Sequence, residues 1–208
     1  MGVQTRPSPL VTARRLRAWL WNLPPPVWLP VATAVSLAVP GLIALLAHEP
    51  ILFASLGPTA LMIAQQPMLA SSRPYNAIVG HLIGLSSGFL AVALLGLASE
   101  PSIFQSHTLT GTRLAAALLA ISVDVTLEVL LRAQHPPTAA TCLLAALGSF
   151  RPGWHDTLVV ATGVIAVTVT AELLRRLHAA QPPPTRRPPR PWGKRDESQL
   201  AIREASSR

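Results

Sequence analysis

Three long apolar stretches constrain the fold of this chain more than any other feature. They are residues 27–47, 77–98 and 158–177. Each reaches the length of about 20 residues that a helix needs to cross a hydrocarbon core. A fourth stretch, residues 114–131, is long enough but contains Asp124 and Glu128. The pattern predicts an all-α fold, a polytopic membrane helix bundle.

The charge distribution supports this class of protein. Only 12% of the residues are charged, against about 25% in a typical soluble domain. Of 17 Lys and Arg residues, four lie in residues 6–17 and nine in residues 175–208, so the apolar part holds only four. No basic stripe crosses that part, and we therefore expect no nucleic-acid partner. The partner that this composition requires is a lipid bilayer.

The same distribution predicts the organisation of the chain. We expect residues 1–18 to be a basic cytoplasmic leader and residues 19–177 to be the membrane domain. Residues 178–208 are rich in Pro and Arg and are expected to be a disordered cytoplasmic tail. Because positive charge accumulates on the cytoplasmic side, both termini are expected there, in the inner (plasma) membrane of a bacterium.

A seven-residue phrase occurs twice, with Ala, Pro, Thr and Ala at the same four positions. Residues 54–60 read Ala-Ser-Leu-Gly-Pro-Thr-Ala, and residues 133–139 read Ala-Gln-His-Pro-Pro-Thr-Ala. Each copy lies at the start of an apolar stretch, residues 51–65 and 137–150, that is shorter than a comfortable membrane span. The duplication predicts two related halves, each with a short proline-initiated helix in its middle.

The positive-inside rule favours six crossings over four. Six crossings place Arg73 and Arg132 on the cytoplasmic side, whereas four crossings with two re-entrant loops place both outside. The chain would then contain two three-segment repeats, about residues 27–98 and 112–177, inverted relative to each other. Inverted repeats are a recurrent plan of transporters, whose binding sites lie near the bilayer midplane.

The two short helices are candidate anion-binding elements. Proline suits the first turn of a helix, and the free N–H groups of that turn carry a partial positive charge. In a low-dielectric interior such a helix end can bind an anion without a cationic side chain. The alternative is that proline and threonine only kink two packed spans. The candidate substrate-binding residues are Gly57, Pro58, Thr59, Asn76, His81, His135, Pro136, Pro137 and Thr138.

Asp124 and Glu128 are the candidate proton-coupling residues. They share a helix face, and ionisable groups inside a membrane segment tend to face the bundle interior. His81 or His135 would be a neighbour that titrates near neutrality. The alternative for Glu128 is an ion pair with Arg132 one turn later. No paired-histidine spacing or cofactor motif is present, and no nucleophile motif supports an enzyme, so we expect no metal, cofactor or catalytic activity.

Gly80, Gly84 and Gly88 place small residues on one face of a long apolar segment. Such a face permits two helices to approach closely. We expect it to accept one of the short helices.

Three motifs together resemble the HPP family of integral membrane proteins. They are the phrase at residues 54–60, Arg73-Pro74-Tyr75-Asn76 leading into Gly80-His81, and His135-Pro136-Pro137, the tripeptide that gives the family its name. The resemblance covers about residues 27–177. It implies a small membrane bundle, usually described with four helices, fewer than the six segments favoured here. Plant plastid members are associated with nitrite transport.

We therefore expect an integral membrane carrier or channel for a small inorganic anion, with nitrite as the first candidate. The alternative is a non-transporting membrane scaffold whose basic tail recruits a partner or anionic lipid. The small size of a six-segment bundle leaves assembly into a homo-oligomer open.

Overall fold

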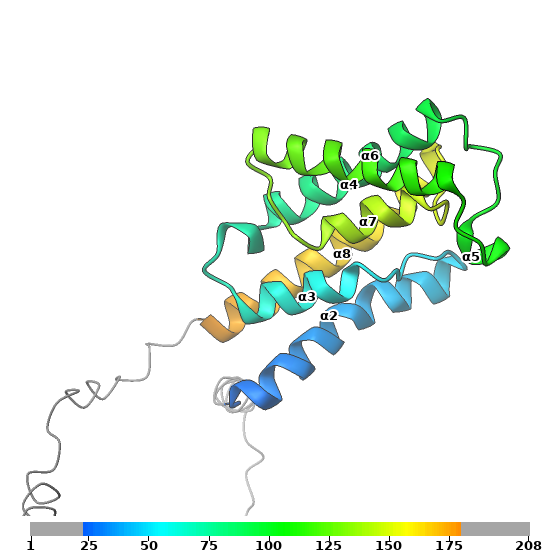
Figure 1. The fold of residues 1–208 in the computed structure, drawn as a ribbon. Helices are drawn as coiled ribbons and strands as arrows, with labels where there is room; N and C mark the ends of the chain where they lie inside the picture. The colour runs from blue at the N-terminus through cyan, green and yellow to red at the C-terminus, as the bar shows by residue number, and fades with distance from the viewer. Residues whose placement is uncertain (1–22, 180–208) are drawn as a thin grey trace, which may run out of the picture.

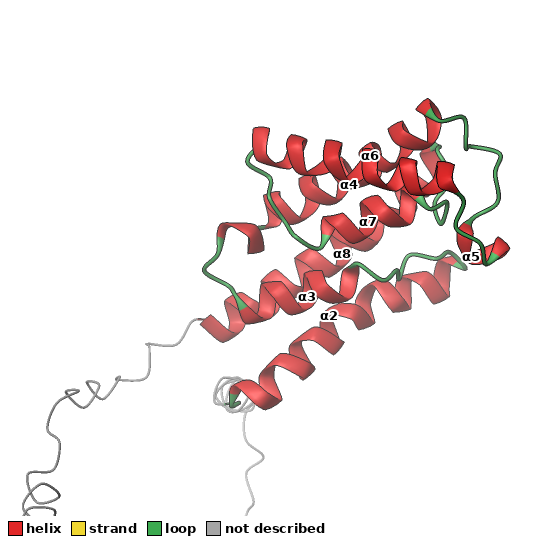
Figure 2. Ribbon diagram, viewed as in Figure 1, coloured by secondary structure: helices red, strands yellow, loops and turns green. Residues whose placement is uncertain are grey.

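The computed structural model of the protein describes residues 23–179. The predicted leader, residues 1–18, and all but the first two residues of the predicted tail lie outside this range. Within it the chain forms seven α-helices and one 3-10 turn, without a strand. Figure 2 shows these helices joined by loops. The predicted all-helical fold is therefore confirmed.

Four long helices run the length of the bundle. They are α2 (Pro25–Ala47), α4 (Pro74–Leu94), α6 (Gly111–Leu130) and α8 (Trp154–Ala179). Helices α2, α4 and α8 are long and apolar enough to cross a membrane. Helix α6 has 20 residues but buries three charged side chains, Arg113, Asp124 and Glu128. Large apolar side chains are exposed along the long helices, for example Leu46 and Val169, as expected of surfaces that face lipid.

Two short helices, α3 (Leu56–Gln65) and α7 (Thr138–Ala146), lie between the long ones. Each is preceded by non-helical chain, residues 48–55 before α3 and residues 131–137 before α7. Proline explains these non-helical parts, because the residue before a proline is pushed out of the helical region. Pro50 follows the end of α2, and Pro136 and Pro137 precede α7. The 3-10 turn η1 (Ala70–Ser72) and the one-turn helix α5 (Ile103–Ser106) complete the connections.

The two short helices begin near the middle of the bundle and run in opposite directions (Figure 1). Helix α3 runs towards the end where α2 begins and α8 finishes, whereas α7 runs towards the end where α5 lies (Figure 1). The non-helical residues before each short helix return the chain from the end of a long helix to this middle level. The duplicated phrase thus marks two chain segments that change from non-helical to helical inside the bundle.

The glycine face of α4 packs directly on α7. A Cβ atom on Gly80 would lie 2.7 Å from Thr138 Cγ2, and one on Gly84 would lie 2.9 Å from the Thr138 carbonyl oxygen. A Cβ atom on Gly88 would lie 2.7 Å from the carbonyl oxygen of Cys142. Any side chain at these positions would separate the helices. The predicted close approach of a short helix to this face is confirmed.

A similar contact joins α8 to the chain before α3. A Cβ atom on Gly163 of α8 would lie 2.5 Å from the Ile51 carbonyl oxygen and 3.0 Å from the Phe53 ring. Helix α4, from the first half of the sequence, therefore packs on the short segment of the second half. Helix α8, from the second half, packs on the short segment of the first.

Replacing Gly88 by Ala should destabilise the bundle. The added methyl group would overlap Ala145 and the backbone of Cys142. Overpacking of this kind costs about 1–3 kcal/mol, more than the gain in helix propensity from Ala. Thermal unfolding of the purified protein in detergent should show a lower Tm. Gly153→Ala is the matched control, because a Cβ atom there meets nothing within 4 Å. A Gly88→Ala variant at least as stable as the wild type would contradict the packing described here.

Candidate functional site

A cluster of polar side chains is buried where α3 and α7 begin. Its members are Ser55, Thr59, His81, Asp124, Glu128, His135, Thr138 and Thr141, each exposed by 8% or less. They come from α3, α4, α6, α7 and the chain just before the two short helices. Burying so many polar groups inside a membrane bundle is costly, and such groups usually mark a functional site. We refer to this group as the central cluster.

His81, on α4, lies at the middle of a hydrogen-bonded chain. Its Nε2 atom lies 2.8 Å from Thr59 Oγ1, and its Nδ1 atom lies 2.7 Å from Thr141 Oγ1. The Thr141 hydroxyl in turn lies 2.6 Å from Ser55 Oγ. A single buried histidine therefore connects the first turn of α3 to α7.

His135 extends this chain to the other end of the site. Its Nε2 atom lies 3.2 Å from Thr59 Oγ1, and its Nδ1 atom lies 2.6 Å from the carbonyl oxygen of Ser71. The two imidazole rings meet edge to face, with centroids 5.4 Å apart. Thr59 thus lies between both histidines, and it also contacts the Ser55 carbonyl at 2.9 Å.

The contacts assign the histidine tautomers. A carbonyl oxygen only accepts hydrogen bonds, so His135 carries its proton on Nδ1, and its Nε2 atom is an acceptor. Thr59 donates its one hydroxyl proton to the Ser55 carbonyl, at 2.9 Å. His81 must therefore donate to Thr59 from Nε2 and accept from Thr141 at Nδ1. With both rings neutral, His135 Nε2 faces the Thr59 oxygen at 3.2 Å but receives no proton from it.

The two acidic residues differ in their contacts. Thr138 Oγ1 donates to Glu128 Oε1 at 2.5 Å, and Glu128 forms no ion pair within residues 23–179. The alternative pairing of Glu128 with Arg132 is therefore wrong, because the chain leaves the helical conformation at Arg132, where φ is +52°. Both carboxyl oxygens of Asp124 are buried without a hydrogen-bond partner in the described part of the chain. Asp124 is therefore the carboxyl group of the cluster that lacks hydrogen-bond partners among the described residues, and it lies against Gly84.

The first turns of the two short helices are not equivalent. In α7 the N–H groups of Thr138, Ala139 and Ala140 donate to the carbonyl groups of residues 135–137, at 2.9 to 3.3 Å. In α3 Pro58 has no N–H, and the N–H groups of Leu56 and Thr59 are bonded to the preceding chain. Among the residues that the structure describes, the N–H of Gly57 has no acceptor in this turn.

The remaining predicted site residues lie around the cluster. Pro58, Pro136 and Pro137 line one groove between α3 and α7, with a volume of about 570 Å³. Asn76 lies apart from them, on a cavity of about 470 Å³ at the end of α6. The Asn76 amide donates to the carbonyl groups of Arg132 and Gln134, at 3.3 and 3.1 Å. These two hydrogen bonds stabilise the non-helical chain before α7.

Sequence reasoning missed Ser55 and Thr141 as members of the cluster. The available signal was helical spacing, because Thr141 follows Thr138 by about one turn and Ser55 precedes Thr59 by about one turn. Within residues 23–179 no group of three or more His, Cys, Asp or Glu side chains could hold a metal ion. The cluster is thus a hydrogen-bonded polar site.

These features define a polytopic membrane protein with a buried polar centre between two interrupted segments. Residues 20–184 match the family described as HPP, transmembrane region. The chain therefore belongs to the HPP family. No curated protein and no solved structure matches it.

The tautomer assignment predicts the nitrogen spectrum of the site. With ¹⁵N-labelled histidine, one neutral ring should show a protonated Nδ1 and disappear in His135→Gln. A second neutral ring should show a protonated Nε2 and disappear in His81→Gln. Solid-state NMR in lipid at neutral pH measures both, and His107→Gln, an exposed loop position, is the control for assignment. The same tautomer at both sites would contradict the hydrogen-bonded chain.

Proposed function

We propose that the protein carries a small inorganic anion across the membrane, with nitrite as the first candidate. The observation that supports this is the central cluster, a fully buried polar site at the meeting point of two short helices. Half-helices whose ends meet near the midplane are the usual setting of substrate sites in transporters. A scaffold whose function lay in its tail would have no need of such a site.

The arrangement of the chain is consistent with an inverted repeat. Each half of the sequence contains a long helix, a non-helical return, a short helix and another long helix, and α3 and α7 run in opposite directions (Figure 1). The two short segments then complete six crossings, with both termini on one side. The basic ends of the chain favour the cytoplasm for that side, in the inner membrane of a bacterium.

Within the central cluster, the anion would bind first at the start of α3. The Gly57 N–H is available there. Thr59 lies in the same helical turn, and His81 of α4 is hydrogen-bonded to it. At α7 the N–H groups are already bonded to nearby carbonyl groups, so Pro136, Pro137 and Thr138 would contact the anion only after this turn opens. Such opening between two states of the bundle is what a carrier requires.

The charge of the cluster favours proton coupling. The site contains Asp124 and Glu128 but no Lys or Arg side chain. An anion would be repelled by two ionised carboxylates in a medium of low dielectric constant. Anion binding is therefore favourable when a carboxyl group takes up a proton. By linkage, proton binding then raises the affinity for the anion by the same factor as anion binding raises the affinity for the proton. Asp124, with no hydrogen-bond partner in the described chain, is the first candidate for this proton.

The proposed transport predicts anion uptake into proteoliposomes. Nitrite, nitrate and formate uptake should exceed that into protein-free vesicles and should increase as the external pH falls. Thr59→Val and Thr138→Val should each reduce uptake about tenfold, the effect of losing roughly 1–2 kcal/mol of hydrogen bonding. Thr126→Val is the matched control, because Thr126 is exposed and bonds only its own helix.

Flux equal to that of empty vesicles for all three anions would remove the proposal. Unchanged uptake in both threonine variants would place transport outside the central cluster. Deleting residues 180–208 distinguishes the carrier from the scaffold. A carrier should keep its uptake, whereas a scaffold would lose binding to its partner or to anionic lipid.

Proton coupling predicts a specific effect of Asp124→Asn. An imposed anion gradient should acidify vesicles that contain the wild-type protein, as read by an internal pH dye. The variant should lose most of this acidification and the pH dependence of its uptake, because an amide cannot exchange a proton. Glu49→Gln is the control, since Glu49 is a half-buried residue outside the cluster whose contact is a surface pair with His155. Equal acidification by Asp124→Asn and the wild type would remove Asp124 from this role.

A further inference from the structure

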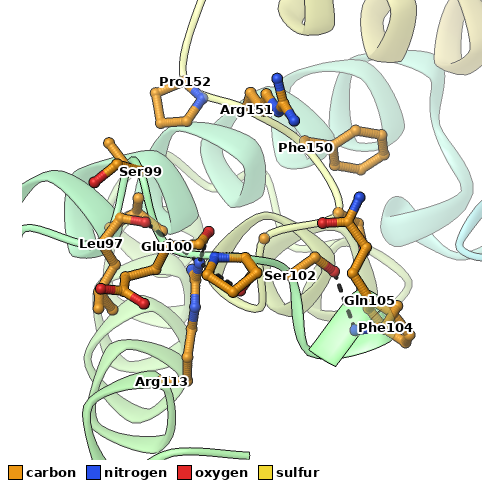
Figure 3. Close-up of a pocket in the computed structure, with 15 residues that line it drawn as sticks. Leu97, Ser99, Glu100, Ser102, Phe104, Gln105, Arg113, Phe150, Arg151 and Pro152 are labelled. Carbon is orange, nitrogen blue, oxygen red and sulfur yellow. Dashed lines mark hydrogen bonds between the residues drawn. The ribbon is translucent and has the colours of Figure 1, made fainter. Parts of the chain in front are cut away.

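A second polar cavity lies at the end of the bundle away from the described termini. Its volume is about 680 Å³, and it forms where α4 connects to α6 and α7 connects to α8. Polar residues that line it include Glu100, Ser102, Gln105, Arg113, Ser149 and Arg151. Figure 3 shows the Arg113 side chain between Glu100 and Ser102, with Arg151 on the other side of the view. We call this space the Arg113 cavity.

Arg113 is a buried cation without a carboxylate partner. It is only 3% exposed, and its guanidinium donates to the carbonyl groups of Ala146 and Glu100, at 3.1 and 2.9 Å. It also reaches the carbonyl groups of Leu97 and Pro101, each at 3.3 Å. No carboxylate lies within ion-pair distance among residues 23–179. Carbonyl dipoles offset only part of a full charge, and a buried unpaired charge is costly.

One nitrogen of this guanidinium has no hydrogen-bond partner within residues 23–179. The Nε atom of Arg113 is buried and has no hydrogen-bond partner in the described chain. The neighbouring turn approaches the guanidinium closely: Gly148 has φ +89°, and a Cβ atom there would lie 3.1 Å from Arg113 Nη2. The Ser102 hydroxyl accepts from the Phe104 N–H and keeps its own proton to donate. These groups provide an anion with donors as well as charge.

The charges that line the cavity leave a positive excess. Arg113 and Arg151 are opposed only by Glu100, so one net positive charge remains. The Arg151 side chain makes no hydrogen bond or ion pair with the described residues, although its backbone N–H donates to Asp156 at 2.7 Å. A single excess charge matches a monovalent anion, and the volume lets that anion keep part of its water shell.

We propose that the Arg113 cavity binds a small monovalent inorganic anion. It is a separate site from the central cluster, at the end of the bundle opposite the start of α2 and the end of α8 (Figure 1). As the place where the anion first binds on its way to the cluster, it rests on the proposed transport function. As an equilibrium binding site it does not depend on transport.

Bromide binding tests the site directly. The protein in nanodiscs of neutral phosphatidylcholine would be titrated with sodium bromide against sodium gluconate, with binding followed by calorimetry. Arg151→Glu should weaken bromide binding about tenfold, because it replaces an attraction by a repulsion. Arg151→Lys should stay near the wild type. Arg73→Glu is the matched control, the same charge reversal at the start of α4, and should change binding less than twofold.

Arg151 is the primary target because Arg113 also bonds four carbonyl groups, so replacing Arg113 can unfold the protein. Crystals soaked in bromide provide a second measurement, with an anomalous peak expected beside Arg113. Binding that is unchanged in Arg151→Glu would overturn the proposal. A bromide peak found only at the central cluster would also overturn it.

Uptake kinetics separate this inference from the proposed function. If the protein transports anions, Arg151→Glu should raise the KM for nitrite or nitrate about tenfold and change kcat less than twofold. If the wild type shows no uptake and Arg151→Glu still weakens bromide binding, the transport function is removed and the anion site in the Arg113 cavity is kept. If the wild type takes up anions but KM and bromide binding are unchanged in Arg151→Glu, the transport function is kept and the anion site in the Arg113 cavity is removed.

Discussion

The direct contact between α4 and α7 is the interaction on which the rest of the structure depends. In lipid, helices gain little from the hydrophobic effect, so their association relies on close packing and hydrogen bonds. The glycine face of α4 brings the backbone of α7 into contact, and this places Thr141 within reach of His81 and Thr138 within reach of Glu128. A wider separation would leave those buried groups without partners.

The long helices could be predicted from the sequence because the bilayer fixes their length and polarity. The short helices are predicted less well: the apolar stretch at residues 51–65 contains α3, but the chain is not helical before Leu56. Extended backbone inside a membrane bundle is stable only where neighbours satisfy it. For the chain before α7 that neighbour is Asn76, whose amide bonds Arg132 and Gln134, and such a contact is set by tertiary structure.

The central cluster was predicted in part. His81 and His135 stand out in a sequence because ionisable groups are costly in membrane segments. Thr141 and Ser55 do not, because Ser and Thr in apolar helices often bond their own backbone. Arg113 was visible only as one of few internal charges. Its role depends on the ends of α4 and α7 meeting around it. One of its hydrogen-bond acceptors, the Ala146 carbonyl, is 33 residues away in the chain, and such a contact cannot be read from the sequence.

The position of Cys142 has a practical consequence. It is the only cysteine in the sequence, it is fully buried on α7, and its backbone faces Gly84 and Gly88. A thiol reagent can therefore reach it only when α7 separates from the side chains of α4 and α6 that pack around it. The rate of its alkylation measures how often this interface opens, on the same basis as local unfolding measured by hydrogen exchange. The unmodified chain thus carries its own probe of conformational exchange.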